Sequence, residues 1–285
     1  MKTGFEFDEE QSRRVEAMYR TSDIVGQQRE VLRLLSLRPG ERVLDIGSGP
    51  GQQTSEIAVA VGASGGVHGI DSSRSMIAIA RKRCGEQRGM DFQLAAATKL
   101  PFKDKSFEVA TCTQVYEYVA EIGAALSELY RVLSPGGRAL ILDTDWDSIV
   151  WHTTDRVRMR RILRAWDGHL ADPRLPETLL PALRKVGFQT IETHLFPLLN
   201  TNCSEDTYSY WLIRFIESFV VGRDDITGED STAWAGELRK LHEDGSYFFS
   251  LNRYIFLVRK ARADNVMTGM TNDSRLALNS RSTQF

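Results

Sequence analysis

Cysteine is scarce in this sequence, and its few copies are far apart. Cys84, Cys112 and Cys203 are the three cysteines among 285 residues. An odd number at such wide spacing matches neither a disulfide framework nor a zinc site, which needs ligands in close pairs. We therefore expect no metal centre and a reducing compartment, the cytoplasm.

Long apolar runs and a surplus of one charge are missing as well. No stretch reaches the ~18 consecutive apolar residues that a membrane-spanning helix needs. The first ten residues carry acids in place of the apolar segment of a signal peptide. A net charge of −2 gives no general electrostatic reason to bind nucleic acid or an anionic membrane. A small molecule is therefore the expected partner, and the oligomeric state is left open.

The most informative stretch is a short apolar segment that runs into a glycine-rich turn. Residues 43–46 (VLDI) predict a buried strand, and glycines follow at positions 47, 49 and 51. Glycines between a strand and a helix permit a tight turn and let a ligand lie against the backbone. Asp45 stands at the mouth of this strand, and a second predicted strand over 67–70 leads to Asp71. An acid at the end of a second strand is where a nucleotide ribose presents its two hydroxyls.

Four blocks in a fixed order make the sequence resemble the class I S-adenosylmethionine-dependent methyltransferases. They are the glycine loop, residues 69–71 (GID), residues 100–108 (LPFKDKSFE) and residues 131–138 (RVLSPGGR). The resemblance covers roughly residues 40–145, continues more loosely to 260, and is nearest to the ubiquinone/menaquinone type. It implies S-adenosyl-L-methionine as the cofactor and O-, N- or C-methylation of a small organic acceptor.

Strand and helix signals alternate along this region, as in a parallel sheet that helices cover on both faces. We expect strands over 43–46, 67–70, 90–94, 107–112 and 138–143, with helices over 52–61, 73–84 and 121–133 between them. The resemblance implies a Rossmann-like, doubly wound α/β fold whose seven strands are mostly parallel. In that fold the last two strands, here predicted over 188–196 and 247–258, form an antiparallel hairpin at the sheet edge.

Helices outside this core complete a single predicted domain over residues 1–260. A connection of ~50 residues before the last strand is too long for a turn, so we expect a helical insertion that covers the substrate site. The polar end of the chain is expected to be disordered. The predicted parts are an N-terminal helical cap over 1–38 with helices over 8–21 and 24–37, a cofactor-binding core over 40–145, helices over 153–168 and 176–186, an insertion over 200–245 with helices over 204–221 and 230–243, and a tail over 261–285.

The resemblance assigns most cofactor contacts by position. Asp45 would lie near the methionine end of the cofactor, the glycine loop would approach it by backbone, and Asp71 would bind the ribose. The family usually carries an adenine-binding acid where Ala96 stands, so backbone groups and Thr98 would hold adenine instead. Packing is the alternative role for Tyr19, and helix entry for Ser72. The predicted cofactor set is Tyr19, Asp45, Gly47, Ser48, Gly49, Gly51, Asp71, Ser72, Met76, Ala96, Ala97, Thr98 and Gln114.

Acids and aromatic residues gather after the fifth predicted strand, where ligands bind in open α/β sheets. Transfer of a methyl group from a sulfonium needs mainly alignment, and a base only when the nucleophile must lose a proton. His152 and Asp145 are the candidate catalytic residues. Helix capping and core packing are the alternative roles for this group. The candidate substrate-binding residues are Asp143, Trp146, Trp151, Tyr208 and Trp211.

The aromatic residues of the insertion have helical spacing. Tyr208, Trp211 and Phe215 stand at i, i+3 and i+7, which would place them on one helix face. That face either packs into the core or roofs an apolar pocket above the acids of the fifth strand. Both alternatives are kept.

Two other functions remain open. An NAD-dependent oxidoreductase also uses a glycine turn and a distal acid, although it would show G-x-G-x-x-G rather than the G-x-G-x-G spacing of Gly47, Gly49 and Gly51. A non-catalytic binding protein with the methyltransferase fold would fit the missing acid at Ala96. Calorimetry with S-adenosylmethionine and with NADH distinguishes the three.

Overall fold

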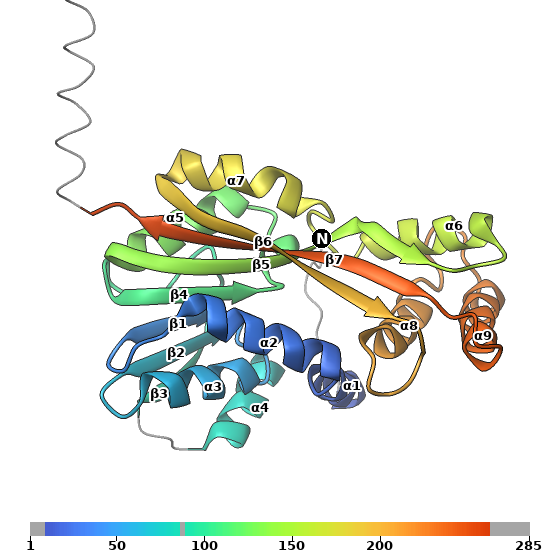
Figure 1. Cartoon of the computed structure of the whole chain (residues 1–285), viewed down its shortest axis with the longest axis horizontal. Coiled ribbons are helices and arrows are strands. Elements are labelled where there is room, and N and C mark those ends of the chain that lie inside the picture. The colour runs from blue at the N-terminus through green and yellow to red at the C-terminus, as the bar shows by residue number, and fades with distance from the viewer. Residues whose placement is uncertain (1–8, 86–88, 263–285) are drawn as a thin grey trace, which may run out of the picture.

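The computed structural model describes residues 9–85 and 89–262. Within them, seven strands form one sheet in the order β3-β2-β1-β4-β5-β7-β6 (Figure 1). β1 to β5 are parallel, and β7 runs antiparallel to both β5 and β6. The predicted α/β fold, with a mostly parallel sheet and an antiparallel edge hairpin, is confirmed. The strands are β1 Arg42–Ile46, β2 Gly66–Asp71, β3 Met90–Leu94, β4 Phe107–Thr113, β5 Leu133–Trp151, β6 Phe188–Asn200 and β7 Phe249–Lys260.

The helices cover both faces of this sheet. α2 and α3 pack on one face through a cluster that contains Leu35 and Ile57, while α5 and α7 pack on the other through Leu129 and Leu183. Both faces of β1 are therefore buried, which explains why its residues are apolar apart from the exposed Arg42 and the buried Asp45. The helices are α1 Glu9–Tyr19, α2 Ser22–Leu35, α3 Gln52–Val61, α4 Arg74–Cys84, α5 Ile122–Val132, α6 Arg156–Asp167, α7 Leu175–Val186, α8 Tyr208–Phe219, α9 Gly228–Glu243 and the short 3-10 helix η1 Tyr116–Tyr118.

Local capping fixes where several helices begin. The Thr21 hydroxyl accepts a hydrogen bond from the Ile24 amide at the start of α2, and Ser73 does the same for the Met76 amide at the start of α4. A capping box between Thr227 and Asp230 opens α9. Within residues 9–85 and 89–262, every helix is too short or too polar to cross a membrane. The tail predicted over 261–285 lies outside the described residues from 263 onward.

The fifth strand is much longer than the predicted segment 138–143. β5 runs from Leu133 to Trp151, and its second half pairs with β7 beyond a register shift between Asp145 and Val150. The sequence is mostly polar from Asp143 to Ser148, which predicts an end of the strand at residue 143. Pairing with β7 satisfies the backbone groups of this polar stretch, so the strand continues.

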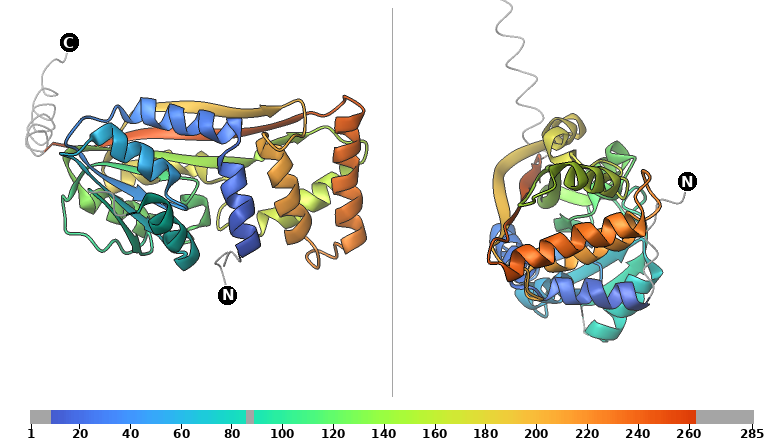
Figure 2. Two further views of the ribbon diagram at one scale, coloured as in Figure 1. Left: turned by 90° about the horizontal axis from the view of Figure 1, so that it is seen from below. Right: turned by 90° about the vertical axis from the view of Figure 1, so that its right-hand side faces the viewer.

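The far halves of β5, β6 and β7 extend past the other strands and carry a second hydrophobic core (Figure 1). α6, α8 and α9 pack there around four buried tryptophans, and α1 lies beside α8 (Figure 2). The predicted insertion between the last two strands is thus present as α8 and α9. The four tryptophans are Trp146, Trp151, Trp166 and Trp234.

Candidate functional site

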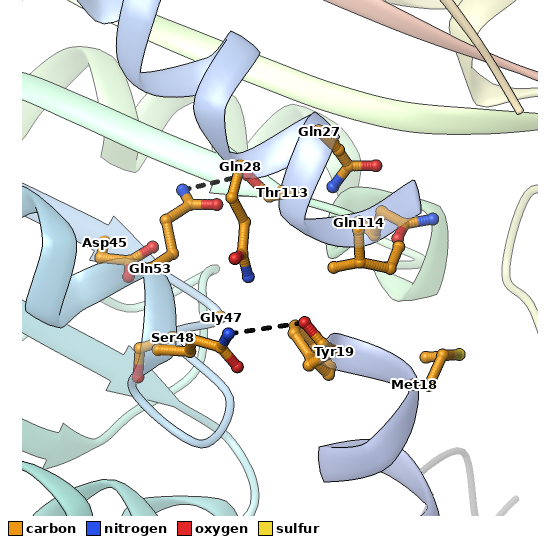
Figure 3. Close-up of a pocket in the computed structure, with 12 residues that line it drawn as sticks. Met18, Tyr19, Gln27, Gln28, Asp45, Gly47, Ser48, Gln53, Thr113 and Gln114 are labelled. Atoms are coloured by element: carbon orange, nitrogen blue, oxygen red, sulfur yellow. Dashed lines mark hydrogen bonds between the residues drawn. The ribbon is translucent and has the colours of Figure 1, made fainter. Parts of the chain in front are cut away.

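A pocket opens at the carboxyl ends of β1 and β4, where α1 and α2 meet the glycine loop (Figure 3). Five of the predicted cofactor residues line it, among them Tyr19 on α1 and Gln114 directly after β4. The N-terminal helices therefore form part of its wall. The lining residues are Met18, Tyr19, Ile24, Gln27, Gln28, Asp45, Gly47, Ser48, Gln52, Gln53, Thr113 and Gln114.

The three glycines of the loop have different surroundings. All have positive φ, but a Cβ on Gly47 would lie 2.1 Å from the Val115 side chain, and one on Gly51 would lie 3.0 Å from the Phe92 ring. Gly47 and Gly51 are therefore required by packing. A Cβ on Gly49 would face the Tyr19 hydroxyl at 3.6 Å, so this glycine borders the site.

Asp71 holds the glycine loop in place from the end of β2. One carboxylate oxygen accepts the Gly49 amide at 2.9 Å, and the other accepts the Ser73 amide at 2.8 Å. Burial raises the pKa of Asp71, and the amide donors oppose that rise. A carboxylate oxygen can accept more than one hydrogen bond, so both oxygens can still receive ribose hydroxyls.

Asp45 lines the pocket and is buried. Its carboxylate accepts the Thr54 hydroxyl at 2.6 Å, which ties β1 to the first turn of α3. Burial raises the pKa of Asp45 to about 6, against the effect of the Thr54 hydrogen bond. The carboxyl thus stands ready to accept from a cationic group in the pocket.

Several polar atoms at the pocket have no hydrogen-bond partner among the described residues. They are the side-chain nitrogen and oxygen of Gln28, the Ser48 hydroxyl and the side-chain oxygen of Gln52. Gln28 extends from α2 into the space between Ser48 and Tyr19 (Figure 3). A buried polar group without a partner costs about 1–3 kcal/mol, so these atoms favour a ligand rich in polar groups. The amino-acid end of S-adenosylmethionine fits this requirement.

Sequence reasoning missed four of the lining glutamines. Gln27 and Gln28 interrupt the apolar stripe of α2, and Gln52 and Gln53 open α3 directly after the glycine loop. A pair of amide side chains inside an apolar helix face was the available signal, because buried polar residues need partners.

The residues predicted to surround adenine flank Asp71, outside the pocket described above. Ser72 is exposed at the end of β2, and the amide of Ala95 bonds to the Asp71 carbonyl at 3.0 Å. This hydrogen bond brings the segment from Ala96 to Thr98 close to Asp71 at the end of β2. Met76 is buried in the first turn of α4. The adenine contacts of this group stay predictions.

The predicted substrate residue Asp143 has an internal role in the structure. Its carboxylate accepts the amides of Val115 and Glu117, at 3.2 and 3.4 Å, and so fixes the loop after β4. Burial, together with the nearby Glu117, raises the pKa of Asp143. Glu117 in turn accepts the Trp146 indole N–H at 3.2 Å, and Trp146 is buried. Asp143 and Trp146 are thus engaged within the protein, although the second carboxylate oxygen of Asp143 has no hydrogen-bond partner among the described residues. Their contact with a substrate stays a prediction.

The candidate base His152 is not at the pocket. Thr144 and Trp151 pair with Arg253 and Phe249, four residues apart along β7, or ~13 Å. His152 follows Trp151 and is exposed. β5 continues past the pocket instead of ending there, which places His152 away from it, and the catalytic role of His152 stays a prediction.

Two more predicted residues at this end of β5 have local partners. Trp151 is buried and donates its indole N–H to the Tyr247 hydroxyl at 2.9 Å, which places it in the core, and its contact with a substrate stays a prediction. Asp145 accepts the Asp147 amide at 3.2 Å and does not line the pocket.

The aromatic residues of α8 lie along one side of the helix, but at unequal depth: Tyr208 is buried, whereas Trp211 and Phe215 are partly exposed. The buried face of α8 contains Tyr208, Leu212 and Ile216. Trp211 lies beside this face, half-exposed, and donates its indole N–H to the Glu205 carbonyl at 2.8 Å. Tyr208 is buried, with its ring centroid 4.5 Å from the guanidinium carbon of Arg253. Trp211 therefore lies at the edge of the buried face that contains Leu212, and its contact with a substrate stays a prediction.

The sheet order, the glycine loop tied to an acid on β2 and the pocket at the strand ends together define the class I methyltransferase fold. Residues 44–141 match the family model described as methyltransferase domain. The resemblance to S-adenosylmethionine-dependent methyltransferases is thereby confirmed for this part of the chain.

Similar proteins agree with this assignment. The chain is 38% identical over 153 residues to an uncharacterized 37.1 kDa protein in transposon TN4556 of Streptomyces fradiae, covering 53% of this chain and 43% of that protein. It is 38% identical over 118 residues to a demethylmenaquinone methyltransferase of Symbiobacterium thermophilum, covering 40% and 47%. The chain therefore spans about half the length of the curated relatives that it matches.

A solved structure extends the similarity beyond the central domain. Phosphoethanolamine N-methyltransferase 2 of Haemonchus contortus, in complex with S-adenosyl-L-methionine, has a TM-score of 0.60 at 19% identity. The match covers 90% of this chain and 58% of that chain. At this identity it shows the shared fold.

Proposed function

We propose that this chain transfers the methyl group of S-adenosylmethionine to a small organic acceptor. The observation that carries this proposal is the glycine loop, held by Asp71, beside a pocket whose buried polar atoms lack partners. When bound, the cofactor supplies a methyl group on an already activated sulfonium. The protein therefore has to align the acceptor and keep the site dry.

The described residues fit these two tasks. Asp71 would bind the ribose hydroxyls, and Gln28, Ser48 and Gln52 the amino-acid end. Tyr19 lies over Gly49 and would exclude water from the loop; burial and the nearby Asp71 raise the pKa of its hydroxyl to about 12, so it stays neutral.

Gln114 is held rigidly at the end of β4. Its side-chain amide donates to the Thr144 hydroxyl at 2.7 Å, and its backbone amide donates to the Leu142 carbonyl at 2.6 Å. Its φ is +53°, a region that non-glycine residues rarely adopt. Strain of this kind is held where a side chain must point in one direction, which supports a positioning role for Gln114.

The acceptor would have an apolar or aromatic body, and its site would lie toward α8. Support comes from the aromatic core beside the pocket and from the relative that acts on demethylmenaquinone by name. A cytoplasmic location is part of the proposal, supported by three cysteines that are all unpaired. We propose no role in binding nucleic acid or membranes.

Calorimetry with S-adenosylmethionine, S-adenosylhomocysteine and NADH tests the proposal. We expect the first two to bind and NADH not to bind. Asp71→Ala should weaken binding of S-adenosylhomocysteine by about 1.5–3 kcal/mol, because a charge-assisted contact to two hydroxyls is lost. Asp91→Ala, at an exposed acid on β3, is the control and should bind normally.

Other results would contradict the proposal. Binding of NADH alone would favour an oxidoreductase. Binding of neither cofactor would favour a non-catalytic protein with this fold. Unchanged affinity in folded Asp71→Ala would remove Asp71 from the site.

A further inference from the structure

A buried arginine lies beside the pocket, on the side of the second core. Arg253 is on β7, where it pairs with Thr144 of β5 and Phe196 of β6, and its side chain is 0% exposed. One terminal nitrogen, Nη1, donates to the side-chain oxygen of Gln27, which lines the pocket. The ring of Tyr208 packs against the guanidinium.

The rest of this guanidinium makes no hydrogen bond of ordinary geometry within the described residues. The Tyr208 hydroxyl is close to it: burial raises the pKa of Tyr208, and the interaction with Arg253 opposes that rise. The unpartnered atoms are Nε and Nη2 of Arg253. These two nitrogens lie on one edge of the guanidinium plane, the edge that binds the two oxygens of a carboxylate through parallel hydrogen bonds. A charge buried with unused donors is costly, so this edge calls for an anion.

A neighbouring acid, Glu117, does not supply that anion. Glu117 is close enough for Arg253 to lower its pKa, although burial has the larger effect and raises it. The side chain of Glu117 is engaged by the Thr144 amide, at 3.1 Å, and by Trp146. No hydrogen bond links Glu117 to Arg253 in the part of the chain that the structure describes.

We propose that Arg253 binds a carboxylate group of the methyl acceptor through its Nε and Nη2 edge. This inference rests on the proposed function and adds the substrate class, a small apolar or aromatic carboxylic acid. Gln27 stands between the pocket and the guanidinium, and Tyr208 would contact the acceptor body.

The position also suits alignment with the methyl donor. Cross-strand neighbours have Cβ atoms ~5 Å apart, and Thr144, the neighbour of Arg253, accepts the side-chain amide of Gln114. A carboxylate held at Arg253 would therefore keep the acceptor beside Gln114. The amino-acid end of the cofactor would have its own group of unpartnered atoms, those of Gln28, Ser48 and Gln52 in the pocket.

Binding of a simple aromatic acid tests the inference. The probes are 2-naphthoate and its neutral counterpart 2-naphthamide, titrated by calorimetry into protein saturated with S-adenosylhomocysteine. We expect wild-type protein to bind the carboxylate at least ~10-fold more tightly than the amide. Arg253→Lys keeps the positive charge beside Glu117 but removes the two-donor edge, and should abolish most of this preference.

A matched substitution controls for the loss of a guanidinium elsewhere. Arg239→Lys changes a half-exposed arginine of α9 that pairs with Glu217 at 2.6 Å, and should keep the full preference. If Arg253→Lys does not fold, Arg253→Met combined with Glu117→Gln removes both charges together and should also lose the preference.

Three results would overturn the inference. The first is that wild-type protein binds S-adenosylhomocysteine but does not bind 2-naphthoate more tightly than 2-naphthamide; this would overturn the inference and leave the proposed function intact. The second is that Arg253→Lys still binds 2-naphthoate more tightly than 2-naphthamide by the wild-type factor. Weaker binding of S-adenosylhomocysteine in Arg253→Lys, with the naphthoate preference intact, would assign Arg253 to the cofactor. Failure of the wild-type protein to bind S-adenosylhomocysteine would instead refute the proposed function.

Discussion

At the scale of single residues, the site depends on carboxyl groups that are kept away from water. Asp45 and Asp71 both have raised pKa values because they are buried, and each is held by hydrogen bonds from the turn that it supports. Their first role is therefore to shape the loop. Contact with a ligand is added to a geometry that already exists, which limits the reorganisation needed on binding.

The burial of Asp45 predicts a pH dependence of stability. Its pKa is about 6 in the folded state against 3.8 ordinarily, so between these values the folded state holds a proton that the unfolded state releases. The free energy of unfolding should therefore fall as the pH rises through this window, and the contribution of Asp45 should be constant above it. Asp45→Asn cannot ionise and should lose this part of the slope.

Urea unfolding at pH values from about 4 to 8 measures the effect. Asp91→Asn, at an exposed acid, should keep the wild-type slope. An Asp45→Asn variant with an unaltered pH profile would show that the buried carboxyl does not titrate in this range.

At the scale of elements, the glycine loop combines two requirements that substitutions can separate. Gly47→Ala places a methyl group 2.1 Å from a Val115 methyl at a φ of +72°, so overpacking adds ~1–3 kcal/mol to the backbone strain. Gly49→Ala has the same kind of backbone strain, but the added methyl group has space around it, with its nearest neighbour at 3.6 Å. This substitution should therefore chiefly weaken binding of S-adenosylhomocysteine. Gly245→Ala, with a φ of +70° and open space around it, measures the strain alone.

Chemical unfolding and calorimetry on the three variants give the two quantities. Equal stability of Gly47→Ala and Gly245→Ala would refute the packing role of Gly47. Wild-type affinity in Gly49→Ala would mean that the loop does not touch the cofactor at that position.

Elements whose signals are local were predictable from the sequence, and those that depend on distant pairing were not. The glycine loop, the Ser73 cap and the alternation from β1 to β4 each follow from neighbouring residues. The end of β5 depends on β7, about 100 residues later, and misplacing that end put His152 at the site. Arg253 was missed although it interrupts an apolar strand, because the strand alone does not show what packs against it.

At the scale of the whole molecule, two hydrophobic regions lie along one sheet. Trp234 is fully buried in the region formed by α6, α8 and α9, whereas Trp211 lies at its surface. Trp234→Ala should lower the free energy of unfolding by ~3–5 kcal/mol, as expected for a large core residue. Trp211→Ala should change it by less than ~1 kcal/mol.

Thermal or urea unfolding of both variants checks this difference. A Trp211→Ala variant that unfolds as readily as Trp234→Ala would show that Trp211 belongs to the core. If Trp211→Ala is stable but turnover of the acceptor is lost, the predicted roof over the substrate is correct despite its surface position.

The strand β7 passes through every part of this arrangement. Phe249 and Leu251 belong to the tryptophan-rich core, Ile255 and Leu257 to the layer under α2, and Val258 to the layer under α5. Because β7 lies between β5 and β6, its backbone amides are shielded from water along its length. The distal core therefore cannot open without loosening the strand that the cofactor domain shares, so the amides of β7 should exchange with deuterium only through global unfolding, and the described chain should melt as one cooperative unit.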